Sequence, residues 1–270
     1  MAVTGRPRTY YGDRPATPAE RAARWRRQHR PVVPPDVVCR TFGSCTLYCS
    51  RWEPLYDFLP RQAAIVSDPP YNAGYDVTKT RRQPSQWARN FVGHDQDFDP
   101  TPWLRFPEVI LFGADTYWDP RLAGGSWVYW DKTEGKDPGD FARFEFIWLS
   151  TPGPPQYFPW QHRGGMRRGE MNWVRLPTKR HPAEKPVELL TFLVKQTIAP
   201  IVIDPFMGAG TTLAACVRLG RPCIGVELDP TYFAVACDRL QDELQQLALF
   251  PQAPAPAYSP SRLPTGQVNQ

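Results

Sequence analysis

The feature that most constrains the fold is a regular alternation of helical and strand patterns in the last third of the chain. Residue periodicity predicts helices over residues 187–194, 211–219 and 230–249, and strands within residues 198–203 and 222–226. Parallel strands need long crossover connections, which are usually helices. The alternation therefore predicts an α/β fold with a mostly parallel sheet, in which ligands bind beyond the C-terminal ends of the strands.

The first half of the chain adds further predicted strands. Apolar runs predict strands over residues 37–39, 63–67, 108–112, 127–130 and 144–149. Residues 43–45 are expected to form a turn because they contain glycine and serine. Residues 47–59 have helical spacing, so we expect a helix between the first two of these strands.

The composition divides the chain into three parts. Residues 1–36 are expected to be a basic arm and linker, residues 37–249 the α/β domain, and residues 250–270 a disordered tail rich in proline, glutamine and serine. Within the domain, residues 72–102 and 151–180 are predicted to be long inserted loops. Long loops in compact domains are often functional.

Positive charge is concentrated at the N-terminus. Residues 1–32 hold eight arginines against two acids, a balance of +6, whereas the whole chain carries +5. This indicates a polyanionic partner, although a solvated tail gives the same pattern. Residues 151–180 interleave tryptophan with basic residues, which is typical of nucleic-acid contact as well as of a solvated loop. We expect DNA contacts from Arg24, Arg27, Arg163, Arg167, Arg168, Arg175, Lys179 and Arg180.

The cysteines and the hydropathy exclude several classes of protein. None of the six cysteines forms a C-x-x-C pair, and only four histidines are present, so neither a structural zinc site nor a disulfide framework is expected. Free thiols in a reducing cytoplasm are the expectation. No apolar run reaches about 18 residues, so no membrane span is predicted. The oligomeric state is open, and a homodimer is compatible with the sequence.

A tetrapeptide with unusual stiffness follows the predicted strand at residues 63–67. It consists of Asp68, Pro69, Pro70 and Tyr71. Two consecutive prolines fix two φ angles and remove two backbone donors. The result is a rigid platform that carries a carboxylate, free carbonyl groups and an aromatic ring, which together suit a planar amino-heterocycle. The tetrapeptide alone is equally typical of a turn that ends a strand.

A glycine-rich loop joins the predicted strand at 198–203 to the helix at 211–219. Its glycines allow a close backbone approach to a ligand, and the helix N-terminus offers free N–H groups. An acid about 20 residues later, Glu227, lies where ribose hydroxyls are held in Rossmann-like sites. No P-loop lysine is present, so a nucleoside without pyrophosphate is expected, and S-adenosylmethionine fits. The candidate cofactor residues are Asp204, Phe206, Gly208, Gly210, Thr211, Glu227 and Lys185.

Three motifs in this order resemble those of amino-group DNA methyltransferases. They are residues 68–71, the His181-x-x-x-Lys185-Pro186 segment and residues 204–212. Because the catalytic motif precedes the cofactor motif, the order resembles the permuted β class. The resemblance implies a Rossmann-like, S-adenosylmethionine-dependent fold over roughly residues 37–248, with an inserted target-recognition segment and double-stranded DNA as the substrate.

The resemblance also implies a mechanism and a target. Asp68 and a prolyl carbonyl would accept hydrogen bonds from the amino group of a flipped base, and Tyr71 would stack on that base. Aspartate at position 68 favours N6-adenine over N4-cytosine as the target. A catalytically silent DNA-binding relative is the alternative from another class, and methylation of RNA or of a protein glutamine is a third. No metal is required.

Overall fold

The structure is a computed structural model. It describes residues 37–71, 97–117, 119–136, 142–163 and 184–249, together with short strands at 10–11, 14–15 and 166–167. The short strands are β1 (Tyr10–Tyr11), β2 (Arg14–Pro15) and β11 (Met166–Arg167), of which β1 and β2 form an antiparallel pair. The rest of the expected N-terminal arm and the expected C-terminal tail lie outside the described residues.

The described residues form one large mixed sheet. Its strands are β3 (Val38–Phe42), β4 (Cys45–Cys49), β5 (Ala64–Ser67), β6 (Glu108–Phe112), β7 (Ser126–Asp131), β8 (Phe144–Leu149), β9 (Gln156–Pro159), β12 (Val202–Asp204) and β13 (Cys223–Glu227). Their order is β3-β4-β13-β12-β5-β6-β8-β7-β9. The five central strands, β4 to β6, are all parallel to one another. The predicted α/β fold with a mostly parallel sheet is therefore confirmed.

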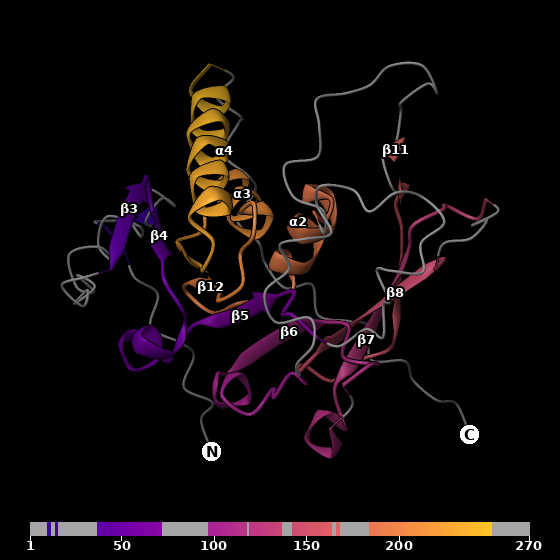
Figure 1. The fold of residues 1–270 in the computed structure, drawn as a ribbon. Coiled ribbons are helices and arrows are strands. Elements are labelled where there is room, and N and C mark those ends of the chain that lie inside the picture. The colour runs from indigo at the N-terminus through magenta and orange to yellow at the C-terminus, as the bar shows by residue number, and fades with distance from the viewer. Residues whose placement is uncertain are drawn as a thin grey trace, which may run out of the picture.

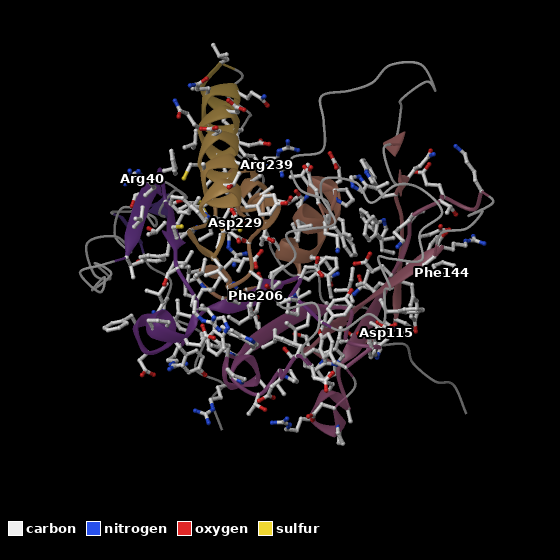
Figure 2. All side chains as sticks on the ribbon, in the orientation of Figure 1. Arg40, Asp115, Phe144, Phe206, Asp229 and Arg239 are labelled. Atoms are coloured by element: carbon white, nitrogen blue, oxygen red, sulfur yellow. A yellow bond between two sulfur atoms is a disulfide. The ribbon has the colours of Figure 1, made fainter. Side chains whose placement is uncertain are left out.

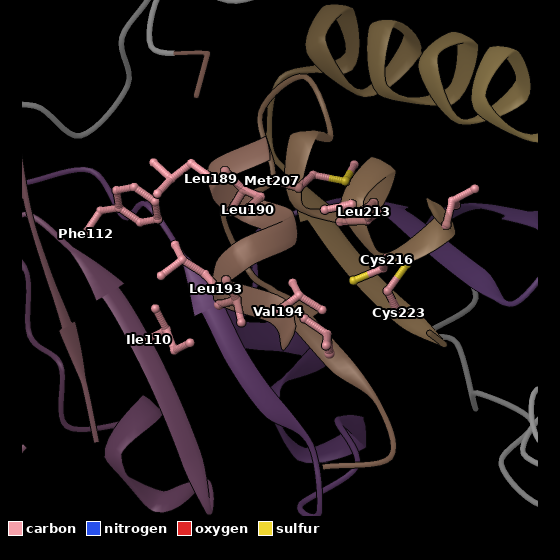
Figure 3. Close-up of a cluster of buried hydrophobic side chains, with 14 of the residues drawn as sticks. Ile110, Phe112, Leu189, Leu190, Leu193, Val194, Met207, Leu213, Cys216 and Cys223 are labelled. Carbon is pink, nitrogen blue, oxygen red and sulfur yellow. The ribbon is translucent and has the colours of Figure 1, made fainter. Parts of the chain in front are cut away.

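Three α-helices cover one face of the sheet (Figure 1): α2 (Val187–Lys195), α3 (Thr211–Arg218) and α4 (Pro230–Leu249). The apolar side of α2 packs between strand β6 and helix α3, where Leu189 and Leu193 are fully buried (Figure 3). Gly220 follows the end of α3, where its N–H donates to Val217 O and the N–H of Arg221 donates to Cys216 O. Within the part of the chain that is described, no helix is long and apolar enough to cross a membrane.

The opposite face is covered by short 3₁₀ helices. They are η1 (Glu53–Phe58), η3 (Trp103–Arg105) and η4 (Pro120–Leu122). Trp103 is 1% exposed and lies among the rings of Trp52, Tyr56 and Phe106. Aromatic side chains thus supply on this face the apolar area that α-helices supply on the other.

The helix predicted over residues 47–59 is wrong. Strand β4 occupies its first part and η1 its second. β4 is buried on both faces, so its apolar residues run continuously and do not alternate, and the run was compatible with helical spacing. β4 pairs with β13 along five residues, and the residue pattern of β4 alone could not reveal these inter-strand hydrogen bonds.

The segment 151–180 is only partly the loop that was expected. Strand β9 adds to the sheet edge in parallel with β7, and β10 (His162–Arg163) pairs with β11. Buried Asp131 anchors β9, because the Tyr157 hydroxyl donates to it at 2.7 Å. Arg143 also donates to Asp131, and these bonds hold the pKa of this carboxyl well below its usual range in spite of burial. Apart from the two residues of β11, residues 164–183 lie outside the described residues.

Two of the six cysteines are not free thiols, contrary to expectation. Cys45 and Cys223 form a disulfide across directly paired positions of β4 and β13. The sequence separates them by 178 residues, so no short spacing pattern marks the pair. Cys39, Cys49, Cys216 and Cys237 are free.

Candidate active site

A cavity of about 850 Å³ opens at the C-terminal ends of the parallel strands. The cavity is lined by both sequence motifs: the Asp-Pro-Pro-Tyr platform, which follows β5, and the glycine loop, which follows β12. Figure 2 shows Phe206 and Asp229 in the middle of the molecule near the foot of α4, with Arg40 and Phe144 at opposite sides. Segments more than 130 residues apart in sequence thus share one site.

A buried hydrogen bond joins the ends of the two central strands. Ser67 Oγ, at the end of β5, donates to Asp204 Oδ1, at the end of β12, at 2.6 Å. The same oxygen accepts the backbone N–H of Phe206 at 3.1 Å and so shapes the start of the glycine loop. Burial raises the pKa of Asp204 to about 6, although Ser67 and Thr212 bond to it. Asp204 therefore organises the loop from below.

The glycine loop lies tightly against its neighbours. Gly210 has φ +74° at the start of α3, and a Cβ there would lie 3.0 Å from Ala236 Cβ on α4, so only glycine fits without strain. Gly208 N–H donates to Glu227 Oε2 at 2.9 Å, and Asp229 N–H donates to Oε1 at 2.8 Å. Each oxygen of Glu227 keeps a second lone pair that can accept a ligand hydroxyl.

An ion pair clamps the glycine loop from behind. Arg239 of α4 lies 3.0 Å from Glu184 Oε1 and donates to Thr211 Oγ1 at 2.9 Å. Both charged side chains are buried, at 8% and 6% exposed. Arg239 and Glu184 thus connect α4, the first residue of α3 and the segment that leads to α2.

Lys185 lies between two carboxylates at the mouth of the platform. Its Nζ donates to Asp68 Oδ2 at 2.6 Å and lies 2.9 Å from Glu145 Oε1. Lys132 Nζ lies 3.6 Å from the other oxygen of Glu145. The predicted cofactor residue Lys185 therefore contacts the predicted catalytic carboxylate, and through Glu145 it connects that carboxylate to β8.

The charges in this group stabilise one another. Burial raises the pKa of Asp68, and Lys185 opposes that rise. Burial alone would lower the pKa of Lys185, but Asp68 and Glu145 outweigh burial and hold it above its usual value. Burial would likewise raise the pKa of Glu145, but Lys185 and Lys132 outweigh it and lower that pKa. Lys185 therefore remains an ammonium ion and is not a base.

The Tyr71 ring packs against backbone on one side. A Cβ on Gly113 would lie 2.2 Å from Tyr71 Cζ, so the ring covers Gly113 directly. Tyr117 lies 5.6 Å away and donates its hydroxyl to Phe112 O. From Tyr117 the aromatic contacts continue to Phe98 and then to Phe206. A continuous aromatic wall thus connects the platform to the glycine loop.

The catalytic and cofactor candidates of the sequence converge on one cavity, which is lined by Asp68, Pro69, Pro70, Tyr71, Lys185, Asp204, Phe206, Gly208, Thr211 and Glu227. Gly210 lies beside it at the start of α3. Most of the DNA-contact candidates lie outside the described residues. Arg163 and Arg167 are described only as backbone of β10 and β11. His181, Arg168, Arg175, Lys179, Arg180, Arg24 and Arg27 lie outside the described residues.

Sequence reasoning missed Glu145, Glu184 and Arg239. A signal existed for two of them. Glu145 is a lone charge in the apolar run of β8, and Arg239 lies on the buried side of α4 beside Ala236 and Leu240. Charged residues in such places are rarely buried unless they are paired. For Tyr117 and Phe98, which lie in loops, no local pattern was informative.

Comparison with known families matches part of the chain. Residues 128–238 match the family model of N6/N4 methyltransferases, described as DNA methylase. The type II methyltransferase M.Cfr9I of Citrobacter freundii is 32% identical over 111 residues, which cover 37% of each chain. M.HpaI of Haemophilus parainfluenzae is 28% identical over 221 residues, 66% of this chain and 68% of that protein. The chain thus spans little more than a third of M.Cfr9I.

Solved structures show distant likeness. The M1.HpyAVI–SAM complex has a TM-score of 0.44 and 22% identity, covering 72% of this chain and 99% of that one. The cytosine-N4-specific PvuII DNA methyltransferase has a TM-score of 0.45 and 15% identity, covering 75% of this chain and 92% of that one. The family match spans the glycine loop and Lys185, which line the cavity, and Glu145, which contacts Lys185. On that match, residues 128–238 are similar to the N6/N4 family of DNA methylases.

Proposed function

We propose that this chain transfers a methyl group from S-adenosylmethionine to the N6 amino group of an adenine flipped out of double-stranded DNA. The observation that carries the proposal is the opposition, in one cavity, of a carboxylate platform and a nucleoside-type glycine loop. A base amine and an adenosyl cofactor are the two ligands that this pair of features suits.

The residues on the glycine-loop side fit the cofactor. Glu227 can accept ribose hydroxyls, the N-terminus of α3 offers backbone N–H groups to a carboxylate, and the Phe206 ring lies at the cavity wall. When bound, S-adenosylmethionine would supply an electrophilic methyl group. Its carboxylate would also find a positive charge at Lys185, although the ammonium group is already bonded to Asp68.

The residues on the platform side fit an exocyclic amine. Lys185 occupies Oδ2 of Asp68, so Oδ1 is available to accept one amino hydrogen. The carbonyl of Pro69 can accept the other. These two bonds would favour the tetrahedral nitrogen of the transition state, and Tyr71 would hold the ring in plane. Extruding the base costs a few kcal/mol, and stacking on Tyr71 would offset part of that cost.

The test is to incubate the chain with duplex DNA and S-adenosylmethionine carrying a labelled methyl group, digest the DNA and identify labelled nucleosides by mass spectrometry. Labelled N6-methyl-2′-deoxyadenosine supports the proposal. Label in N4-methylcytosine alone contradicts the adenine assignment while keeping the reaction. Label found only in competing RNA or protein contradicts DNA as the substrate, and no label in any of the three contradicts the function.

Replacing Asp68 provides the internal control. Asp68→Asn removes the acceptor charge, so we expect the single-turnover rate to fall by at least about 100-fold, as for loss of a transition-state contact. Asp57→Asn changes an exposed carboxylate of η1 that pairs with Arg61. The single-turnover rate of this variant should match that of the unaltered chain. Equal rates for Asp68→Asn and Asp57→Asn would exclude Asp68 from the chemistry.

A further inference from the structure

A buried carboxylate on β8 lies behind the platform and outside every motif of the sequence. The Glu145 side chain is 17% exposed, and its Oε1 lies 2.9 Å from Nζ of Lys185, the same nitrogen that bonds Asp68. Lys185 is 14% exposed and also lies over the Phe112 ring, 5.2 Å from its centroid. Two carboxylates and one ring therefore fix the ammonium group in place.

We propose that Glu145 is a positioning residue for methyl transfer: it holds Lys185 against one oxygen of Asp68, so that the other oxygen faces the target amine. This inference rests on the proposed function and deepens it. Glu145 does not contact the target amine of the base, because Lys185 lies between the carboxylates of Glu145 and Asp68. Its effect passes through the ammonium group.

The geometry favours positioning over simple charge balance. Lysine is a flexible point charge with four rotatable bonds, and by itself it would bind either oxygen of Asp68 or turn away. A second carboxylate at 2.9 Å restricts Nζ to one place between the two acids. A restricted Lys185 in turn restricts the Asp68 carboxylate to one rotamer. Alignment of this kind can change a rate by about 100-fold for a displacement of 1 Å.

Several other charged or titratable groups lie around Asp68. Tyr71 follows it on the platform, Tyr117 and Asp115 come from the loop after β6, and Asp204 comes from β12. Lys132, from the end of β7, acts through Glu145. Among the groups that affect Asp68 itself, Lys185 lowers its pKa and Glu145 raises it. Lys185 and Glu145 therefore shift the pKa of Asp68 in opposite directions. Titration of Asp68 in variants of each residue gives a test whose result a change in packing alone would not reproduce.

The direct test is the titration of Asp68 in the protein without DNA or cofactor, followed by ¹³C-carboxyl NMR and assigned with Asp68→Asn. We expect the titration midpoint of Asp68 to fall in Glu145→Gln and to rise in Lys185→Met. The double variant Lys185→Met/Glu145→Gln keeps the local charge balanced, and its midpoint should lie between those of the single variants. This variant also covers the case in which Lys185→Met alone fails to fold. A midpoint that no substitution moves overturns the inference.

The second readout is the single-turnover rate of methyl transfer across pH, alongside the dissociation constants for cofactor and DNA. Glu145→Gln should lower the rate about 10- to 100-fold, with both dissociation constants within about twofold. The acidic limb of the pH–rate profile of Glu145→Gln should move to lower pH, in the same direction as the Asp68 midpoint in the NMR titration. Asp57→Asn should match the unaltered chain.

The two possible failures are distinguishable. A Glu145→Gln enzyme with the unaltered rate and pH profile overturns the inference while leaving the proposed function intact. A loss of rate caused entirely by weaker cofactor binding also overturns it, because Glu145 would then serve the cofactor. Absence of transfer by the unaltered chain contradicts the proposed function, and the inference falls with it.

Discussion

Asp204 illustrates how a single buried carboxyl at a strand end ties stability to pH. Its side chain is 3% exposed, and burial raises its pKa to about 6 from 3.8. Protonation is therefore easier in the folded chain than in the unfolded one. The stability that this group contributes is fully present below about pH 4 and is lost as pH rises through about 6.

Asp204→Asn should remove this dependence, because asparagine stays neutral yet can still accept from the Phe206 N–H. We expect the free energy of unfolding of the unaltered chain to fall, relative to Asp204→Asn, by about 3 kcal/mol between pH 4 and 7. Chemical denaturation of both proteins at several pH values measures the difference. A constant difference would mean that Asp204 is ionised throughout this range.

Gly113 offers a second prediction for a single residue. Alanine there would meet the Tyr71 ring at 2.2 Å and would also strain a backbone with φ +66°. Gly113→Ala should displace Tyr71 and lower methyl transfer at least about tenfold, with cofactor affinity unchanged within about twofold. The matched control is Gly124→Ala, which has φ +82° and no atom within 4 Å. Both variants share a backbone cost of about 1–2 kcal/mol, so only a difference in activity supports the role of the ring.

At the scale of elements, the Arg239–Glu184 pair connects three segments of the site. Arg239→Met would remove an ion-pair partner of the buried Glu184 carboxylate, so it should destabilise the fold by about 3–5 kcal/mol. Arg239→Met/Glu184→Gln should recover most of that loss. Arg61→Met, which breaks an exposed pair with Asp57 of η1, should cost no more than about 1 kcal/mol. Urea denaturation compares them, and similar losses for Arg239→Met and Arg61→Met would mean that the buried pair is not special.

The elements also show what the sequence could predict. Strands β6 and β8 begin and end where their apolar runs do, and α4 begins directly after Asp229, whose carboxylate caps it through Thr231 N–H. β4 could not be predicted, because its continuous burial depends on β13, which lies far away in sequence.

The same limit applies to the site. The glycine loop and the Asp-Pro-Pro-Tyr platform are contiguous in sequence, so their residue types alone indicated ligand contact. Glu145 and Tyr117 reach the site only through the order of β5, β6 and β8 in the sheet. A single sequence does not encode that order locally, and their part in the site therefore emerges only from the fold.

At the scale of the whole molecule, the basic arm remains a prediction, since Arg24 and Arg27 lie outside the described residues. Each phosphate contact steepens the decline of log affinity with log salt by about 0.9. Replacing both arginines by glutamine should therefore reduce the slope for duplex DNA by up to about 2, as measured by fluorescence anisotropy. Arg61→Gln/Arg121→Gln removes two arginines that already pair with acids, and its slope should not change. An unchanged slope for the arm variant would place the arm away from DNA.

The position of β4 beside β13 has a consequence for how the chain is made. β4 leaves the ribosome early, but its inner neighbour follows only about 180 residues later, as the 178-residue separation of Cys45 and Cys223 records. At about 5–20 residues per second, that interval lasts roughly 10–35 s. During this time β4 and β5 each present an unpaired, strongly apolar edge, which is a template for wrong pairing. Newly made chains therefore depend on protection of these edges until β12 and β13 insert between them and complete both the sheet and its cavity.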